Sequence, residues 1–441
     1  MTNIPPWNKP LRLRVFLVLW RIAWFVLMPG LLFYLWNRGR HDPLYRQRLG
    51  QRFGFHAKRD KPHVWIHAVS IGELRSVVPL IRALLERGEH VVTTHFTPAG
   101  LREAEKIFTD EIVTGQLSAV YVPFDYGLAF RRFFRAFRPK YGLVMEVEFW
   151  PGMITASRRT DIPLFLCNGQ YPAKSFERDK DKSLSPALLV PGFAGVMVKS
   201  DLQASRFQSL GQNRIAITGE MRFEQPVPPA HLARAADLRA MPALADRPII
   251  TLASVVEWEE DLFLSATQAL LDRPQSTRPL IVYVPRAPER FDAVADKLAD
   301  AGLSFACRST ALNPDLSPVG DIQDLDILLG DSLGEMFFYL ALCDFAVTGG
   351  GFNPRGSHNI IEPLALGKPV IVGPEIWTIE YPAVEAIAAG VAQQVDGGEL
   401  PQTLLNPQMP DQAQIDTFLA DHAGAVKKTL IALETWFSPE T

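Results

Sequence analysis

The stretch HVWIHAVSIGELRSVVPLIRALLERGEHVVTT (63–94) decides the fold class of this chain. Its first part, 63–69, is a short apolar run of strand length, and 72–87 has the composition and length of a helix. A second apolar run follows at 90–94. A strand, a helix and another strand in this order form a βαβ unit with parallel strands. We therefore predict an α/β fold.

The same alternation of strands and helices continues along the rest of the chain. A helix is predicted at 101–108, and further strands follow at 119–122, 141–146, 164–168, 195–199 and 215–219. A second series of strands is predicted at 248–253, 280–284, 303–306, 326–329, 345–348, 369–372 and 390–393. Regular alternation of this kind predicts parallel, doubly wound sheets with helices on both faces.

The chain length of 441 residues indicates more than one domain. The stretch 224–247 is rich in Pro and Ala and lacks strand runs, so we interpret it as a linker. We predict an N-terminal segment at 1–40 and a Rossmann-like domain at 41–223. After the linker, a second Rossmann-like domain is predicted at 248–441, with a cleft between the two domains.

The N-terminal segment contains the run VFLVLWRIAWFVLMPGLLFYLW (15–36), which is apolar except for Arg21. Its length matches the roughly 20 residues that cross a bilayer. Pro29-Gly30 would break or kink a helix, and Arg21 would reach the headgroups only if it lies near the membrane surface. A spanning helix, a helix lying in the membrane plane and an apolar helix buried in the protein all remain open. An arginine-rich flank predicts that the body stays cytoplasmic; it comprises Arg38, Arg40, Arg46, Arg48 and Arg52.

The charge of the chain is unevenly distributed. Residues 1–61 contain 12 Lys and Arg against 2 acids, a local charge of +10. Since the net charge of the chain is −3, the remaining residues carry −13. A basic end on an acidic body indicates an anionic membrane surface as partner. It argues against nucleic acid, which needs a basic groove with stacking aromatics. The three cysteines lack metal-ligand spacing, so we expect no metal site.

The first strand-to-helix turn, HAVSIGE (67–73), is a candidate catalytic element. Ligands of open α/β sheets bind at the carboxyl ends of the strands, where this turn lies. We expect Gly72 to permit a tight turn and Glu73 to accept a proton from an attacking hydroxyl. The alternative is that Glu73 is a helix-start charge favoured by the macrodipole.

The segment MEVEFWP (145–151) places two further carboxylates at a strand end. Glu146 and Glu148 would point to opposite faces of a continuing strand and would then not act as a pair. If the strand stops at Glu146, both side chains would face the cleft. A purely structural role for both remains the alternative.

The second half of the chain has a glycine turn, VTGGG (347–351), followed by SHNIIEP (357–363). Such a turn beside a helix N-terminus supplies unpaired N–H groups for a phosphate. Glu362, one turn into the helix, would bind ribose hydroxyls. This constellation predicts a nucleotide site in the second domain.

Eight short motifs, spread over about residues 45–393, occur in an order that resembles the 3-deoxy-D-manno-octulosonic acid (Kdo) transferases of lipopolysaccharide biosynthesis. They are HAVSIGE (67–73), TTHFTPAG (93–100), YVPFD (121–125), MEVEFWP (145–151), SDLQASRF (200–207), VPRAPERF (284–291), GDSLGE (330–335) and SHNIIEP (357–363). The apolar N-terminal segment with its basic flank also fits this family.

The resemblance implies a GT-B glycosyltransferase fold and an inverting transfer of Kdo from CMP-Kdo to lipid A or its precursor. It implies no metal or other cofactor, and a location on the cytoplasmic face of the inner membrane. It makes Glu73 the catalytic base. The implied acceptor-binding residues are Ser70, Gly72, Thr97, Glu146 and Glu148. The implied donor-binding residues are Arg286, Gly334, Glu335, Gly350, Ser357, His358, Asn359 and Glu362.

Four stretches depart from the pattern of that family. Its Asn-Ala-Arg-Leu-Ser is NGQYP (168–172) here, and its Gly-Asn-x-Lys-Phe-Asp is GEMRFE (219–224). Its Ser-Thr-His before a Gly-Glu pair is replaced within SVVEWE (254–259), and the His of Pro-Arg-His-Pro is Ala287. Two other interpretations therefore stay open. One is a divergent paralogue that uses another CMP- or nucleotide-activated sugar and another lipid acceptor; the other is a non-catalytic membrane-bound scaffold.

Overall fold

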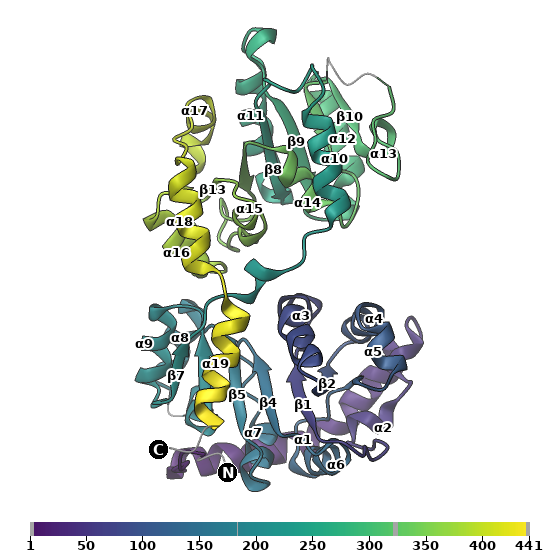
Figure 1. The fold of residues 1–441 in the computed structure, drawn as a ribbon, viewed down its shortest axis with the longest axis vertical. Coiled ribbons are helices and arrows are strands. Elements are labelled where there is room, and N and C mark those ends of the chain that lie inside the picture. The colour runs from purple at the N-terminus through teal and green to yellow at the C-terminus, as the bar shows by residue number, and fades with distance from the viewer. Residues whose placement is uncertain (1–3, 183, 321–324, 438–441) are drawn as a thin grey trace. The chain divides into compact units, whose positions relative to one another are not determined.

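The computed structural model describes residues 4–182, 184–320 and 325–437. The chain forms two compact units (Figure 1). Unit 1 comprises Met1–Gln225 and Gly424–Thr441, and unit 2 comprises Pro226–Ala423. Each unit is described by itself.

Unit 1 is built on a parallel sheet of seven strands within the described residues, in the order β3-β2-β1-β4-β5-β6-β7. The strands are β1 (His63–His67), β2 (His90–His95), β3 (Leu117–Tyr121), β4 (Tyr141–Met145), β5 (Leu164–Gly169), β6 (Gly195–Val198) and β7 (Ile215–Ile217). The helices are α1 (Leu11–Arg38), α2 (Leu49–Arg52), α3 (Ile71–Glu86), α4 (Pro98–Ile107), α5 (Thr109–Val113), α6 (Gly127–Phe137), α7 (Pro151–Arg159), α8 (Ala173–Lys180), α9 (Asp201–Ser209) and α19 (Ala425–Phe437).

Unit 2 repeats this design with a second seven-stranded parallel sheet, in the order β10-β11-β9-β8-β12-β13-β14, counted over the described residues. The strands are β8 (Ile249–Val255), β9 (Leu280–Pro285), β10 (Phe305–Cys307), β11 (Ile327–Leu329), β12 (Phe345–Thr348), β13 (Val370–Val372) and β14 (Ala392–Gln394). The helices are α10 (Pro229–Arg239), α11 (Glu260–Leu271), α12 (Phe291–Asp300), α13 (Arg308–Ala311), α14 (Met336–Leu342), α15 (Ile361–Ala365), α16 (Glu380–Ala388), α17 (Leu400–Leu405) and α18 (Gln412–His422).

Every strand predicted from the sequence is present, with ends shifted by a few residues. Most of the strands are buried on both faces, which is why they read as continuous apolar runs rather than as alternating patterns, and β7, β10 and β14 are only partly buried. In β1, Val64 and Ile66 belong to one core of unit 1, together with residues of α3 and α19. Trp65 belongs to the other core, with α1, α6 and α7, and its indole packs against Phe133.

The predicted linker at 224–247 is wrong for most of its length. Residues Pro229–Arg239 form α10, which packs against α14. Ala235 and Leu238, three residues apart, face the core of unit 2 together with Leu244. The Pro- and Ala-rich composition thus marks the first helix of unit 2, and the unit begins at Pro226.

The end of the chain also departs from the predicted domain at 248–441. Helix α19 lies in unit 1, where Leu430 and Leu433 enter the core that contains β1 and α3. Trp436 stacks on Phe165 of β5 with ring centroids 5.4 Å apart. The apolar face of α19 is therefore covered by a sheet more than 200 residues earlier in the sequence, which no local pattern reveals.

The apolar N-terminal segment forms the single helix α1, in which Pro29 lies without ending the helix. By length and composition alone α1 is able to cross a membrane, yet only 6% of its most apolar window is buried. This exposure contradicts the interpretation as a helix buried in the protein. One side of α1 contacts unit 1: Leu13 and Leu17 are buried, and the Trp20 indole N–H donates to Asp125 Oδ2 at 2.7 Å.

We predict that Leu433→Ala lowers the free energy of unfolding of unit 1 by about 2–5 kcal/mol, because it leaves a cavity under α19. Hydrogen exchange should show faster exchange in β1 and α3, with unit 2 unchanged. The control is Ile431→Ala, two residues away and 50% exposed, which should change stability by less than about 0.5 kcal/mol. Loss of protection in unit 2 instead would contradict the placement of α19.

Candidate active site

Glu73 lies in the first turn of α3, directly after the carboxyl end of β1. Its Oε2 accepts from the Val69 N–H at 2.7 Å and its Oε1 from the Ser70 hydroxyl at 3.2 Å. The Ser70 oxygen in turn accepts from the Glu73 N–H at 3.2 Å, so Ser70 is the N-cap of α3. The alternative role of Glu73 as a helix-start residue is therefore real, and it holds the carboxyl group in one place.

The expected tight turn at Gly72 is wrong. Gly72 lies inside the first turn of α3, and a Cβ there would come no closer than 3.9 Å to neighbouring atoms. No left-handed backbone or close approach requires glycine at this position. Because glycine has no side chain, open space remains beside the guanidinium of Arg222, which would lie 3.9 Å from a Cβ at position 72.

The carboxyl group of Glu73 is poised to exchange a proton near neutral pH. Its side chain is buried, with 8% of the residue exposed. Burial, followed by the negative charges of Glu146 and then Glu148, raises its pKa to about 7. A carboxyl with this pKa is a far better proton acceptor than one in water, and it is still ionised in half of the molecules at pH 7.

Glu146 and Glu148 lie beyond the end of β4, which stops at Met145. The strand therefore ends where the conditional expectation requires, and the orientation of both acids towards a cleft stays a prediction. Glu146 adopts φ 55°, a left-handed conformation that costs a side-chain-bearing residue about 1–2 kcal/mol. Glu148 Oε2 accepts from the Trp150 indole N–H at 2.5 Å, and burial raises the pKa of Glu148.

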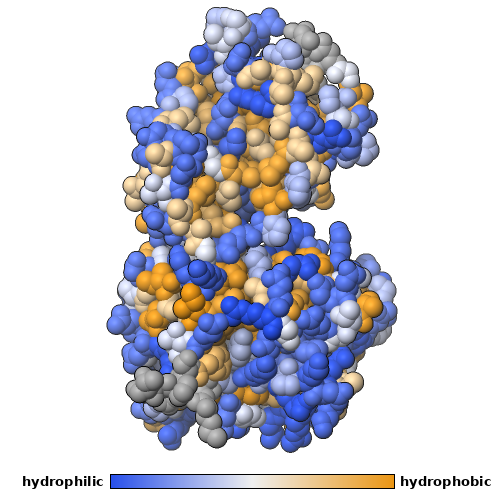
Figure 2. All heavy atoms as spheres, in the orientation of Figure 1, coloured by the Kyte–Doolittle hydropathy of each residue, from blue (hydrophilic) through white to orange (hydrophobic). Residues whose placement is uncertain are grey.

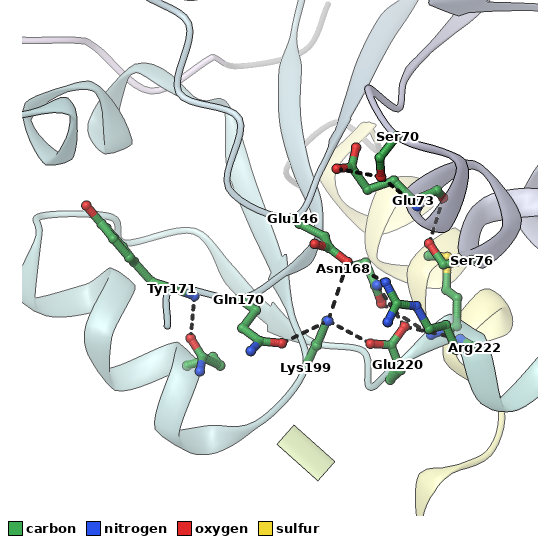
Figure 3. A network of polar contacts seen from close by, with 12 residues as sticks. Ser70, Glu73, Ser76, Glu146, Asn168, Gln170, Tyr171, Lys199, Glu220 and Arg222 are labelled. Atoms are coloured by element: carbon green, nitrogen blue, oxygen red, sulfur yellow. Dashed lines mark hydrogen bonds and ion pairs between the residues drawn. The ribbon is translucent and has the colours of Figure 1, made fainter. Parts of the chain in front are cut away.

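Two cations, Arg222 and Lys199, hold the Glu146 side chain in place (Figure 3). Arg222 donates to Glu146 Oε1 at 3.1 Å, and Lys199 Nζ lies 3.9 Å from the same oxygen. Lys199 is itself buried, 2.6 Å from Glu220 Oε2 and 2.9 Å from Gln170 Oε1. These ion pairs offset the strain at Glu146 and hold its charge close to Glu73.

Glu220 is the buried anchor of the network. Burial alone would raise its pKa, but Lys199 and Arg222 outweigh that effect and hold the pKa below its ordinary value. Its Oε1 accepts from Asn168 Nδ2 at 2.8 Å and from the Arg222 N–H at 3.1 Å. Sequence reasoning missed Lys199, Glu220 and Arg222 as site residues. The two stretches that depart from the family pattern, 168–172 and 219–224, could have pointed to this network, because Asn168 of the first contacts Glu220 of the second.

Thr97 is expected to bind the acceptor, and the structure shows what it does without one. Its hydroxyl oxygen accepts from the Gly100 N–H at 3.2 Å and caps α4. Thr97 and Ser70 thus both cap helices that begin at the carboxyl ends of neighbouring strands. Their role towards an acceptor stays a prediction.

In unit 2, a cavity of about 730 Å³ opens beside the carboxyl ends of β8 and β9. Arg286 and Arg355 line it, and neither forms an ion pair with a carboxylate among the residues that the structure describes. The guanidinium of Arg355 lies over the Trp258 ring, 3.5 Å from its centroid. The cavity therefore offers two arginines without a carboxylate partner to an anionic ligand, although Glu257 and Glu289 also line it.

Three residues predicted to bind the donor also line this cavity, namely Gly350, Ser357 and His358. Ser357 is 3% exposed, and its hydroxyl has no hydrogen-bond partner among the residues that the structure describes. A buried hydroxyl without a partner is costly unless a ligand or water completes it. Burial and the neighbouring Arg286 lower the pKa of His358 to about 4, so its imidazole is neutral at pH 7.

A protein carboxylate takes two N–H groups at the glycine turn predicted to bind a phosphate, so these two are not available to a ligand. Glu259, which is 2% exposed, accepts from the N–H groups of Gly350 at 2.6 Å and Phe352 at 2.8 Å. The N–H groups of Ser357 and His358 donate to backbone carbonyls. Gly350 has φ 90°, and a Cβ there would lie 2.7 Å from a carbonyl oxygen, so this turn requires glycine.

The other predicted donor residues do not line this cavity. Glu335 is held by Arg308 through two bonds of 2.6 and 2.7 Å, next to Gly334. Asn359 caps the start of α15 by accepting from Ile361 N–H at 2.9 Å, and Glu362 follows in the first turn of that helix. Their roles towards a donor stay predictions. Over the described residues, no group of three or more His, Cys, Asp or Glu side chains is arranged to hold a metal ion.

Comparison with known proteins connects both units to one family. Residues 47–225 match the family model described as "3-Deoxy-D-manno-octulosonic-acid transferase (kdotransferase)". The chain is 38% identical to 3-deoxy-D-manno-octulosonic acid transferase of Bordetella pertussis, over 85% of this chain and 87% of that protein. It is 31% identical to the enzyme of the same name from Haemophilus influenzae, over 78% of each.

Solved structures show the same fold at low sequence identity. A glycosyltransferase from Rickettsia africae ESF-5 matches 87% of this chain and all of its own with a TM-score of 0.56 at 13% identity. UDP-GlcNAc 2-epimerase from Neisseria meningitidis matches 85% of this chain and all of its own with a TM-score of 0.54 at 12% identity. Two parallel sheets of this kind form the GT-B fold, and with the sequence matches they place the chain in the 3-deoxy-D-manno-octulosonic acid transferase family.

Proposed function

We propose that this chain is an inverting transferase that moves Kdo from CMP-Kdo to lipid A or its precursor, with Glu73 as general base. The observation that carries the chemistry is the environment of Glu73, a fixed carboxyl whose pKa is about 7. An acceptor hydroxyl is a weak nucleophile at neutral pH, so its attack on the anomeric carbon needs a base within hydrogen-bond reach. The new C–O bond forms as the bond to CMP breaks, and Glu73 takes the hydroxyl proton.

The neighbouring acids tune this step. Glu146 and Glu148 repel a negative charge on Glu73 and so favour its protonated form. As the hydroxyl proton moves to Glu73, that repulsion is relieved, which lowers the free energy of the transition state relative to the ground state. Arg222 keeps Glu146 in place through their 3.1 Å hydrogen bond.

The cavity of unit 2 suits a donor with two negative charges. CMP-Kdo carries a phosphodiester and a carboxylate, and Arg286 and Arg355 line the cavity without an ion pair to any described carboxylate. Ser357 offers a buried hydroxyl, and His358 a neutral imidazole that is able to donate or accept. The residues of two departing stretches, including Trp258 and Ala287, line the same cavity, so donor choice is where this chain would differ from its relatives.

We further propose that α1 attaches the protein to the cytoplasmic face of the inner membrane by lying in the membrane plane. The side of α1 that contacts unit 1 is occupied, with Leu13, Leu17 and Leu35 buried. The opposite side is apolar and exposed; it includes Val15, Ile22, Val26 and Phe33. A helix with one side on the protein and the other exposed and apolar fits the interfacial mode of membrane binding.

Glu73→Gln should lower kcat by roughly 10²–10⁴-fold, because the amide keeps the size and most of the hydrogen bonds of the carboxyl but takes no proton. The affinity for CMP, measured by calorimetry, should stay unchanged. The folded state raises the pKa of Glu73 above its ordinary value, so its contribution to stability is lost as pH rises towards 7. The variant should therefore be at least as stable as the wild type at pH 8. A variant that turns over at the wild-type rate would exclude Glu73 as the base.

The pH profile of the wild type gives an independent test. The base must be ionised, so kcat/KM should rise about tenfold per unit below pH 7 and level off above it. In Glu146→Gln the largest charge effect on Glu73 is removed, and this bend should move to lower pH. Initial rates at saturating donor check this, and an unmoved bend would show that another group titrates.

Arg286→Gln should weaken CMP binding by about 1.5–3 kcal/mol, the contribution of a hydrogen bond to a charged group. Isothermal calorimetry with CMP is the measurement. The control is Arg234→Gln on α10, whose guanidinium pairs with Asp315 outside the cavity. Glu362→Ala is expected to weaken CMP by a similar amount if Glu362 binds the ribose. Unchanged affinity in Arg286→Gln would place the nucleotide elsewhere.

Replacing Ile22, Val26 and Phe33 together by glutamate should release the protein from the membrane fraction, since these residues form the exposed side of α1. Deleting α1 would be less informative because Leu13, Leu17 and Leu35 are buried in unit 1. A control with Val113→Glu and Leu202→Glu, exposed on other helices of unit 1, should stay membrane-bound. Retention of the α1 variant would contradict attachment through this face.

A further inference from the structure

A second cavity, of about 320 Å³, lies in unit 1 between α1, α6 and α7. Its apolar wall includes Leu17 and Trp20 from α1 and Ala156 from α7. Its polar wall is formed by three arginines, one from each helix: Arg21, Arg131 and Arg159. We call this cavity the arginine crevice. It is separate from Glu73 and its network, none of whose residues line it.

The three arginines of the crevice have no protein carboxylate as a partner. Among the described residues, none of them forms an ion pair or a side-chain hydrogen bond. The other side of unit 1 is different, because its arginines are matched to acids, and the surface over α4 and α5 is predominantly hydrophilic in Figure 2. Those matched pairs are Arg48–Glu105, Arg75–Glu103, Arg82–Glu111 and Arg102–Asp42.

The one carboxylate in the crevice is committed to other donors. Asp125 Oδ2 accepts from the Trp20 indole at 2.7 Å and from the Gly152 N–H at 3.0 Å, and Oδ1 accepts from the Met153 N–H at 2.7 Å. Asp125 is 2% exposed, and burial raises its pKa to about 6. One buried negative charge against three arginines leaves the crevice strongly positive.

Positive charge accumulates around the crevice as well. The pKa of Lys9 is lowered first by burial and then by the charges of Arg159, Arg158, Arg21 and Arg14. Such a concentration of like charges is unfavourable in the free protein, and an anion would relieve it.

The crevice also borders the exposed apolar side of α1. Val18, Leu19 and Ile22, which flank Arg21 in the sequence, are about half exposed. A ligand that satisfies both features carries an anionic group for the arginines and hydrocarbon for the helix. From this juxtaposition we propose that the arginine crevice binds the phosphate of an anionic phospholipid of the bilayer on which α1 lies. This inference rests on the proposed membrane attachment of α1.

The proposal explains why an arginine interrupts the apolar run of α1. Arg21 follows Trp20, whose indole is hydrogen-bonded to Asp125, so its position relative to α6 and α7 is determined by that contact. A bound lipid phosphate would then join α1 to both helices. It would hold unit 1 at a defined depth and rotation on the membrane surface.

The test is flotation of the full chain with vesicles of phosphatidylcholine, with and without phosphatidylglycerol. The variant Arg21→Gln/Arg131→Gln/Arg159→Gln is compared with Arg75→Gln/Arg82→Gln/Arg102→Gln, which removes the same charge from the matched side. We expect phosphatidylglycerol to strengthen binding of the wild type. The crevice variant should lose this gain by on the order of a hundredfold, since each basic side chain at an anionic surface contributes roughly fivefold. The control variant should keep most of it.

Three results would overturn the proposal. Equal losses in both variants would mean that binding depends on diffuse charge rather than on the crevice. Inorganic phosphate that displaces phosphatidylglycerol vesicles at millimolar concentration would mean a site for free phosphate. Finally, binding to phosphatidylcholine vesicles that contain lipid A could depend on the three arginines while binding to phosphatidylglycerol does not. That result would assign the crevice to the acceptor.

Two controls separate this proposal from the others. Thermal unfolding checks that the crevice variant is folded, and the single change Arg21→Gln, which leaves Trp20 and Asp125 in place, should already weaken phosphatidylglycerol binding severalfold. The glutamate variant of Ile22, Val26 and Phe33 tests membrane attachment with uncharged vesicles. If it still binds them like the wild type, the attachment proposal fails, whereas loss of the phosphatidylglycerol gain alone concerns only the crevice.

Discussion

The buried ion pair between Lys199 and Glu220, 2.6 Å apart, is the contact on which the candidate active site of unit 1 depends. It joins the end of β6 to the segment after β7, and Asn168 of β5 donates to the same carboxylate. Removing one partner would leave an uncompensated buried charge, which costs about 3–5 kcal/mol. This pair positions the backbone of Arg222, whose side chain holds Glu146 beside Glu73. The pKa of Glu73 is raised first by burial and then by the charge of Glu146, whose position depends on this ion pair.

Unit 2 uses its charges differently. Glu259 takes the backbone N–H groups of the glycine turn, which the sequence pattern suggested for a phosphate. The turn is thereby a fixed structural element, and in the proposed donor site Arg286 and Arg355 on the cavity wall are the anion-binding groups. Arginine side chains reach further than backbone N–H groups and allow for bidentate contacts, so they suit a donor whose phosphate and carboxylate lie apart. The departures from the family pattern in this cavity change its wall and leave these cations in place.

Helix α1 connects the catalytic unit to the proposed membrane surface. Its inward side is held by apolar packing and by a partly buried hydrogen bond from Trp20 to Asp125. Asp125 in turn accepts from the first N–H groups of α7, the helix that follows Glu148 and Trp150. A continuous set of contacts therefore runs from α1 to the loop that carries the two acids next to Glu73.

The sequence by itself determined the strands, the two parallel sheets and the family, because buried parallel strands are local apolar runs and because motifs such as HAVSIGE are contiguous. It also located Glu73, Glu146 and Glu148, which follow strand ends. Only the tertiary structure decided that α19 packs on unit 1 and that 229–239 is a packed helix, since their apolar faces are covered by distant residues. Only the tertiary structure places Lys199, Glu220 and Arg222 near Glu146. It also shows that Glu259 accepts hydrogen bonds from N–H groups at the glycine turn. Charge pairing of this kind depends on distances in space between residues tens of positions apart, and local periodicity carries no information about them.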